Sequence, residues 1–229
     1  NETFEASTVS VLSTSIANSG NAFEQATAAA SGHIALVGSD HPQRRQVEAF
    51  ITGRFLSAHG ARIGHFLPQL IAIFNHNGEV LAALGLRNAS IESLFLEQYL
   101  DAPLEQLLSA HAGNSAVPVQ RKDIIEIGNL ASIDRRASRR LFSFLAEHLI
   151  SEGYRWATFT GCPSLRKIFT LLGIDTFSLG EARVERLAAD QRDWGSYYDD
   201  KPEVLAGRVV GGKALLSRTK TDSTAELAL

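Results

Sequence analysis

Cysteine is almost absent from this sequence. Cys162 is the only one among 229 residues, so an internal disulfide framework is excluded and a reducing compartment is expected. No run of about 18 or more apolar residues occurs, which excludes an ordinary membrane-spanning helix. No basic and then apolar signal segment opens the chain, so we expect a cytoplasmic protein.

The sequence also lacks a strong charge of one sign. Its formal net charge is −3, which disfavours general nucleic-acid binding, although a local basic cluster can still bind an anion. The seven histidines show no spacing typical of metal ligands, so we expect no zinc or other metal site.

What the sequence does contain is a large apolar fraction. Hydrophobic residues make up 45% of the chain, which is enough for the core of one sizeable domain. We place this domain at residues 32–212. Residues 1–31, rich in Ser, Ala and Thr, are expected to be flexible or weakly helical, and residues 213–229 to form a tail.

Apolar periodicity predicts alternating strands and helices along this domain. The strongest local signal is Asn77-Gly78 between two apolar runs, which predicts a β-hairpin. A β-α-β unit from Asp123 onward predicts two parallel strands. The expected fold class is therefore α/β, a mixed β-sheet flanked by helices. Strands are expected at residues 33–39, 67–89 (the hairpin), 123–132, 154–161 and 203–212, and helices at 42–60, 103–112, 138–153 and 163–173.

The stretch IIEIGNLASIDRRASRRLF, residues 124–142, joins a buried strand to a helix. Its turn carries four arginines (Arg135, Arg136, Arg139 and Arg140) and no glycine. So many arginines favour a phosphate, a phosphopantetheine or an acidic carrier-protein surface. The alternative is a solvated first helical turn, yet cations there oppose the helix dipole at a small local cost.

This stretch resembles the phosphate-binding turn of the acyl-CoA N-acyltransferase (GNAT) fold, where the pattern Arg/Gln-x-x-Gly-x-Gly/Ala opens a helix. Ser138 and Arg140 stand at the glycine positions here. The resemblance implies an acyl-CoA or acyl-phosphopantetheine co-substrate, whose arm pairs with the strand and whose phosphates meet the turn. The implied binding residues are Leu130, Ala131, Arg135, Arg136, Ala137, Ser138, Arg139 and Arg140.

A second stretch, GCPSLRKIFTLLGI, resembles the GNAT motif Asn-x-x-Ala-x-x-x-Tyr-x-x-x-Gly-Phe. Cys162 falls at its Asn, Leu165 at its Ala, and Phe169 at the Tyr that often protonates the leaving thiolate. Because phenylalanine cannot donate a proton, another acid is needed, and we expect Tyr198 to supply it.

Longer segments resemble the thermostable hemolysin family, itself GNAT-like, over roughly residues 33–212. The acyl-homoserine-lactone synthases are a more distant resemblance by fold, and they accept acyl groups from acyl carrier protein. The latter resemblance implies a carrier protein as a partner, beside CoA. The segments similar to the hemolysin family are LFLEQYLDAPLEQLL, IIEIGNLA, LRKIFTLLGI and WGSYYDDKPEVLAGRV.

Glu126 and Asn129 are the expected catalytic residues of the central strand, together with Tyr198. Lying three apart, Glu126 and Asn129 point to opposite faces of a regular strand unless a bulge at Gly128 intervenes. A glutamate in an otherwise apolar run is expected to act as a general base or to orient an amine. The alternative is a structural ion pair with an arginine such as Arg87.

Two groups of side chains are expected to bind the acceptor. One precedes a predicted helix and the other lies in the loop WGSYYDDKP, where aromatic residues often line ligand sites. The alternatives are a satisfied polar edge and a packed loop. The residues concerned are Glu97, Gln98, Tyr99, Trp194 and Tyr197.

These features predict an acyltransferase that moves an acyl group from a CoA or carrier-protein thioester to a small-molecule amine. Two alternatives stay open: a membrane-active hemolysin, and a GNAT-shaped binding module without catalysis. The sequence offers the hemolysin no long, lysine-rich amphipathic stretch. The oligomeric state, including a homo-oligomer, also stays open.

Overall fold

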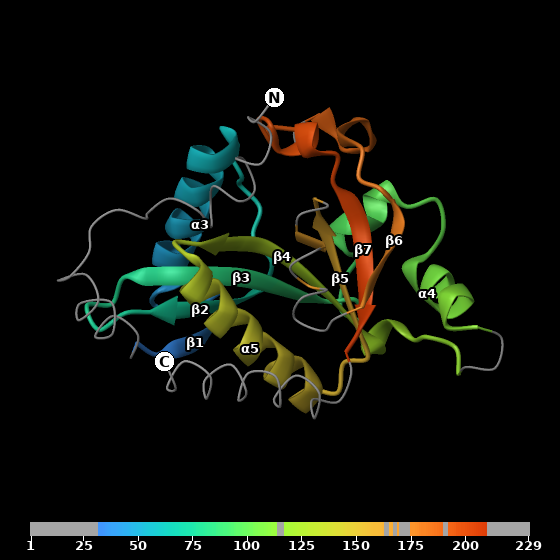
Figure 1. The fold of residues 1–229 in the computed structure, drawn as a ribbon, viewed down its shortest axis with the longest axis horizontal. Helices are drawn as coiled ribbons and strands as arrows, with labels where there is room; N and C mark the ends of the chain where they lie inside the picture. The colour runs from blue at the N-terminus through green and yellow to red at the C-terminus, as the bar shows by residue number, and fades with distance from the viewer. Residues whose placement is uncertain are drawn as a thin grey trace, which may run out of the picture.

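The computed structural model describes residues 32–113, 117–162, 165–166, 169, 175–189 and 192–209. Within these residues, seven strands form one sheet in the order β1-β2-β3-β4-β5-β7-β6 (Figure 1). β4 and β5 are parallel, and the other neighbouring pairs are antiparallel. The expected mixed sheet and parallel β-α-β unit are therefore confirmed. The strands are β1 (Ile34–Val37), β2 (Gln69–Phe74), β3 (Val80–Asn88), β4 (Ile124–Ser132), β5 (Trp156–Gly161), β6 (Thr176–Glu181) and β7 (Glu203–Arg208).

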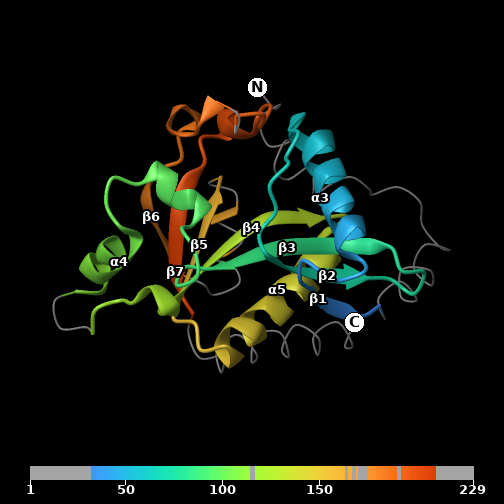
Figure 2. The ribbon, with the colours of Figure 1, turned by 180° about the vertical axis from the view of Figure 1, so that it is seen from behind.

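Helices cover both faces of the sheet. α5 crosses the face turned toward the viewer in Figure 1, and α3 lies in front in the view from behind (Figure 2). α4 lies beside the β6 end of the sheet. The described helices are α3 (Arg44–His59), α4 (Leu104–Ala112) and α5 (Arg135–Ser151), and the short 3-10 helices are η2 (Phe95–Tyr99), η3 (Arg121–Asp123), η4 (Val184–Arg186) and η6 (Tyr197–Asp200).

Alternation along the strands divides the apolar side chains between the two faces. On β2, Ile71 and Ile73 belong to the cluster under α5, whereas Leu70 and Ala72 belong to the cluster under α3. α5 contributes its 3.6-residue stripe to the first cluster, as its apolar spacing predicts. The buried residues of that stripe are Ala137, Leu141, Phe142, Leu145 and Leu149.

Local signals fix where the helices begin and end. α3 stops at Gly60, whose φ of 68° is the left-handed conformation that favours glycine. α5 begins at Arg135, because the side chain of Asp134 accepts a hydrogen bond from the Ala137 amide at 2.7 Å and caps the helix. The hairpin at Asn77-Gly78 is confirmed, with Gly78 at a φ of 77°.

The sequence-based prediction missed one strand. β6 pairs with β7 at the edge of the sheet, and its six residues are half-buried or exposed, so their hydrophobic alternation is weak. The loop predicted at residues 194–202 contains the 3-10 helix η6. The segments 1–31 and 213–229, and most of the predicted helix 163–173, lie outside the described residues.

Candidate active site

β4 and β5 form a fork at the centre of the sheet. Their parallel pairing ends at Ile127 and Phe159, although β4 runs on to Ser132 and β5 to Gly161. Beyond that point β4 remains paired with β3, and β5 with β7. The two facing edges therefore leave room for an extended chain to pair with them.

A bulge on β4 brings both expected catalytic residues to one face. The register with β3 shifts between Ala83 and Gly85, and Asn129 has a φ of 51°. Glu126 pairs with Arg87, and Arg87 lies two residues from Gly85 on β3. The side chain of Glu126 therefore points to the same face of the sheet as the Cα substituent of Gly85 would. The Asn129 carboxamide stands over that face too, since a Cβ at Gly85 would lie 3.0 Å from Asn129 Oδ1. The bulge beside Gly128, which the sequence left open, is therefore present.

A cavity of about 650 Å³ opens at this fork. Its size is typical of small-molecule and cofactor sites, which span about 300–1,000 Å³. The sheet supplies one part of its wall, from β4 (residues 126–130 and 132), Arg87 of β3, and the end of β5 with the residue after it (159–162). The start of α5 (135, 138, 139 and 142), the segment 62–67, Leu165 and Phe169 supply another part. Aromatic residues from α3, η2 and the 193–198 loop complete the wall.

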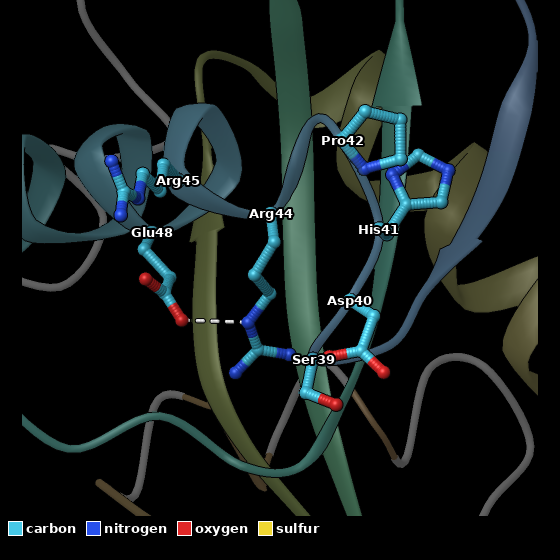
Figure 3. A pocket seen from close by; sticks show the side chains of 7 residues that line it. All are labelled: Ser39, Asp40, His41, Pro42, Arg44, Arg45 and Glu48. Carbon is cyan, nitrogen blue, oxygen red and sulfur yellow. Dashed lines mark hydrogen bonds and ion pairs between the residues drawn. The ribbon is translucent and has the colours of Figure 1, made fainter.

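Asn129 fixes one wall of the cavity. Its Oδ1 accepts a hydrogen bond from the Leu67 amide at 2.9 Å, and its Nδ2 donates to the His65 carbonyl at 3.2 Å. The carboxamide thus acts as a substitute strand partner for this segment. Arg44 holds the same segment from outside, donating to the carbonyls of Leu67 and Pro68 at 2.8 and 3.0 Å. Figure 3 shows Arg44 in a separate surface hollow, ion-paired with Glu48.

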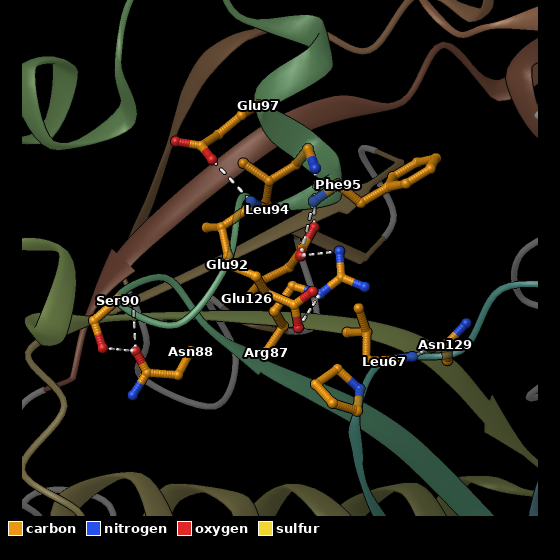
Figure 4. Close-up of polar contacts among 12 residues, drawn as sticks. Leu67, Arg87, Asn88, Ser90, Glu92, Leu94, Phe95, Glu97, Glu126 and Asn129 are labelled. Carbon is orange, nitrogen blue, oxygen red and sulfur yellow. Dashed lines mark hydrogen bonds and ion pairs between the residues drawn. The ribbon is translucent and has the colours of Figure 1, made fainter. Parts of the chain in front are cut away.

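Glu126 is a buried carboxylate on the cavity wall, with 4% of its surface exposed. Its Oε1 accepts the Leu96 amide and its Oε2 the Phe95 amide, both at 3.0 Å (Figure 4). Arg87 Nη1 lies 3.8 Å from Oε2, so the ion pair weighed as an alternative also exists. Burial raises the pKa of Glu126 above the usual range of a glutamate, against the opposing effects of the two amides and Arg87.

An aromatic cluster forms the wall beside Glu126. Trp194 lies at its centre, with ring centroids 5.4 Å from Tyr197, 6.1 Å from Phe95 and 6.2 Å from Tyr198. Tyr198 Oη is hydrogen-bonded to Tyr99 Oη at 2.5 Å.

The tyrosines of this cluster divide between two places. Tyr197 Oη donates to the Thr160 carbonyl at 3.3 Å, on the β5 side of the fork. Tyr99 and Tyr198 lie on the side of Glu126, whose charge acts on Tyr99. Burial raises the pKa of Tyr197, Tyr198 and Tyr99, so all three hydroxyl groups keep their protons at neutral pH.

The arginine-rich turn has only two of its four arginines on the cavity wall. Arg135 and Arg139 line it together with Ser138, whereas Arg136 and Arg140 lie one position further around the helix. Arg140 donates to the Gly32 carbonyl.

The backbone of this turn is already engaged. The Ala137 amide is bound by Asp134, and the Ser138 hydroxyl donates to the Asp134 carbonyl at 3.0 Å. Leu130 lines the cavity, whereas Ala131 is buried outside its wall.

Glu97 and Gln98 face away from the cavity. Glu97 Oε1 lies 2.6 Å from Arg121 Nη1, and its Oε2 accepts the Leu94 amide at 2.8 Å. Burial alone would raise the pKa of Glu97, but the bonds from Arg121 and the Leu94 amide lower it overall. Gln98 donates to the carbonyl of Phe95. Both residues therefore stabilise the η2 turn that presents Tyr99 to the cavity.

Sequence reasoning missed several side chains of the cavity wall, among them Arg62 and His59. His59 is the last residue of α3, and its buried Nδ1 has no hydrogen-bond partner within the described part of the chain. Burial lowers the pKa of His59, against the raising effect of Asp200. Its backbone carbonyl accepts the Ser196 amide at 2.8 Å and so ties the aromatic loop to α3. Nothing in the local sequence signals this long-range contact.

None of the described helices is long and apolar enough to cross a membrane. Among the residues that the structure describes, no three His, Cys, Asp or Glu side chains gather in a way that could hold a metal ion.

The sequence matches the family model described as Thermostable hemolysin over residues 37–213. This match confirms the resemblance expected from the quoted segments. Among curated proteins, none matches the sequence.

Solved structures share the fold at low sequence identity. The AHL synthase LasI is 10% identical with a TM-score of 0.51, covering 79% of this chain and 92% of its own. FeeM, an N-acyl amino acid synthase from uncultured soil microbes, is 11% identical with a TM-score of 0.52, covering 77% and 90%. BjaI, a CoA-dependent acyl-homoserine lactone synthase solved with SAM and isopentyl-CoA, is 12% identical with a TM-score of 0.50, covering 81% and 86%. The chain therefore has a GNAT-like fold.

Proposed function

This chain belongs to the thermostable hemolysin family, and on that premise we propose that it is an N-acyltransferase. It moves an acyl group from a thioester, on CoA or on a carrier protein, to the amine of a small molecule. The observation that carries the proposal is the fork between β4 and β5, which opens into a cavity with a buried carboxylate on its wall. LasI, FeeM and BjaI, which share this fold, are described as an AHL synthase, an N-acyl amino acid synthase and a CoA-dependent acyl-homoserine lactone synthase.

The fork suits the arm of an acyl-pantetheine donor. That arm is an extended chain with two amide groups, and an extended chain can add to an open strand edge through backbone hydrogen bonds. Leu130 lies on the β4 side of the fork and Gly161 on the β5 side, and both line the cavity. The thioester at the tip of the arm then lies near the bulge, where strand amides can polarise its carbonyl.

Glu126 is the proposed general base. Its face of β4 is turned to the cavity, and its raised pKa suits a group that accepts a proton near neutral pH. The amine attacks the thioester carbonyl directly, and Glu126 takes the proton that the amine loses, either directly or through water. Asn129 acts as a positioning residue, since both ends of its carboxamide are used to hold the segment at Leu67.

The leaving thiolate needs a proton that Phe169 cannot give. Phe169 packs in the core, its ring centroid 4.4 Å from that of Phe159. Tyr198 was the acid expected from the sequence, and it lies on the cavity wall bonded to Tyr99. Tyr197 lies closer to the fork, since its hydroxyl donates to the Thr160 carbonyl of β5. We therefore place Tyr197 beside Tyr198 as a candidate acid.

Arg135 and Arg139 are the proposed ligands of the donor's phosphate, with the Ser138 side of the turn beside them. Guanidinium groups bind phosphate oxygens through paired, charge-assisted hydrogen bonds. This contact is available to CoA and to carrier-bound phosphopantetheine, because both carry a phosphate at the same end of the pantetheine arm.

The test is thiol release from an acyl thioester. The purified chain is incubated with acyl-CoA or an acylated carrier protein and a panel of amines, and free thiol and product mass are measured with and without each amine. Amine-dependent release of thiol, with formation of the corresponding amide, is expected. Binding of the donor without transfer to any amine would leave a binding module. Leakage of liposomes without thiol release would favour the membrane-active alternative instead.

A further inference from the structure

The acceptor end of the cavity contains a cation whose hydrogen bonds are poorly satisfied. Arg87 lines the cavity and pairs with Glu126 across the β3–β4 ladder. Its Nη1 lies 3.8 Å from Glu126 Oε2 and its Nε 3.4 Å from Glu92 Oε1 (Figure 4). The Nε atom is buried and has no hydrogen-bond partner among the described residues. A partly buried guanidinium in this state has capacity left for another anion.

A comparison within the chain shows that this pair is not built like a structural ion pair. Arg121 lies 2.6 Å from Glu97 Oε1, and its second nitrogen donates to Oε2 at 3.1 Å, so both partners are satisfied by one another. Glu126 is satisfied by two backbone amides instead. The positive charge of Arg87 therefore compensates the negative charge of Glu126 without a hydrogen bond from the guanidinium to the carboxylate.

We propose that the acceptor is an α-amino acid, with its carboxylate on Arg87 and its amine directed at Glu126. This inference rests on the proposed function. Arg87 and Glu126 stand opposite one another on neighbouring strands, and Arg87 Nη1 lies 3.8 Å from Glu126 Oε2, so their charged ends suit two groups joined by a single carbon. The two charges of the acceptor then meet opposite charges of the protein at the same place.

The neighbouring aromatic side chains define what the amino acid carries. Phe95, Tyr99 and Trp194 line the cavity next to Glu126, whose carboxylate accepts the Phe95 amide. Their rings offer an apolar surface with one hydroxyl group. An amino acid with an apolar or aromatic side chain fits this wall better than a charged one.

The reaction balances without any further reagent. The neutral amine nitrogen forms a bond to the thioester carbonyl carbon, and the C–S bond breaks with its electron pair on sulfur. The amine proton goes to Glu126, and the thiolate takes a proton from a cavity hydroxyl or water. The products are an N-acyl amino acid and a free thiol, and no atom changes its oxidation state.

The experiment compares an amino acid with the amine that lacks its carboxylate, for example phenylalanine with phenethylamine, using one acyl thioester donor throughout. For the wild type, kcat/KM is expected to be about 10- to 100-fold higher with the amino acid, the value of one charge-assisted contact. Arg87→Gln is expected to abolish this preference by raising KM for the amino acid. Its KM for the amine should stay within about threefold of the wild type.

Glu92→Gln is the matched control, because it removes the other carboxylate near Arg87 from a site outside the cavity wall. This variant should keep the preference. Should Arg87→Gln fail to fold, Arg87→Lys keeps the charge but loses the forked geometry, and it should raise KM for the amino acid selectively.

The outcomes separate this inference from the proposed function. Equal use of both acceptors by the wild type, or an equal loss for both in the Arg87 variants, would overturn the amino-acid assignment while leaving the acyltransferase intact. The absence of thiol release with every amine would remove the proposed function and the assignment with it.

Discussion

Replacing Glu126 by Gln tests the chemistry most directly. The substitution keeps the size of a side chain that is 4% exposed and removes its ability to accept a proton. A general base contributes about 10²- to 10⁴-fold to a rate, so kcat should fall by about that factor. KM for the thioester should change little, because the donor binds at the fork and the arginine turn.

The structural cost of this variant can be worked out separately. The carboxylate accepts one amide on each oxygen, whereas glutamine has one acceptor oxygen and turns an NH₂ group toward the other amide. Loss of one such bond costs about 1–3 kcal/mol of unfolding free energy. The removal of a buried charge offsets part of that cost.

Two measurements then decide the role of Glu126. Turnover is followed by thiol release, and stability by denaturant unfolding of the same sample. Glu97→Gln is the control, since that carboxylate also accepts a backbone amide, that of Leu94 directly before η2, but lies outside the cavity wall. It should lose stability and keep turnover. Wild-type turnover in Glu126→Gln would refute the assignment of Glu126 as the base, and parallel losses in both variants would make its role structural.

The raised pKa of Glu126 also predicts how stability and kcat/KM change with pH in the wild type and in Glu126→Gln. Because burial raises the pKa of Glu126 in the folded protein, its contribution to stability is complete below the unfolded-state pKa and is lost as pH rises through the folded-state value. The stability of Glu126→Gln relative to the wild type should therefore increase with pH. In the wild type kcat/KM should rise as Glu126 loses its proton, and the variant should lack this limb.

Three further predictions concern the donor side of the cavity. Tyr197→Phe should lower kcat about 10²-fold or more with an alkyl thioester. With an aryl thioester, whose leaving group needs no acid, kcat of this variant should return to the wild-type value. The same pattern in Tyr198→Phe instead would assign the proton to Tyr198. Arg135→Gln combined with Arg139→Gln should raise KM about 10- to 100-fold for donors that carry a phosphate, and leave a phosphate-free pantetheine thioester unaffected; equal effects on both donors would exclude a phosphate contact. Asp134→Ala should cost about 1 kcal/mol of unfolding free energy through loss of the helix cap, measured by denaturant unfolding; a smaller KM for acyl-CoA in this variant would show that the carboxylate repels the donor.

Hydrophobic periodicity was a sufficient guide wherever an element buries one continuous face. α3, α5 and the hairpin follow their apolar spacing, and their ends follow from Gly60, Asp134 and Asn77-Gly78. β6 was not predicted, because an edge strand whose residues are half-buried or exposed shows no clear alternation of apolar and polar residues. Helices and strands were therefore predicted correctly where burial in the core requires apolar residues at regular positions.

The candidate site was harder to predict, because side-chain direction depends on tertiary contacts. Glu97, Gln98 and Tyr99 are consecutive in a 3-10 helix, and only Tyr99 reaches the cavity. No periodicity in so short a segment fixes which side faces inward. The arginine turn did contain a usable signal, since Arg135 and Arg139 are four residues apart and must share a helix face.

Asp134 and these two arginines together bear on the identity of the donor. In the phosphate-binding turns that this segment resembles, free amides at a helix start meet a pyrophosphate. Here a carboxylate already occupies the Ala137 amide, so a pyrophosphate at that place would face a negative charge at close range. The two guanidiniums on the cavity wall compensate for that carboxylate with one positive charge left over. That balance suits the single phosphodiester of carrier-bound phosphopantetheine better than the several charges of CoA, and it makes an acylated carrier protein the first donor to assay.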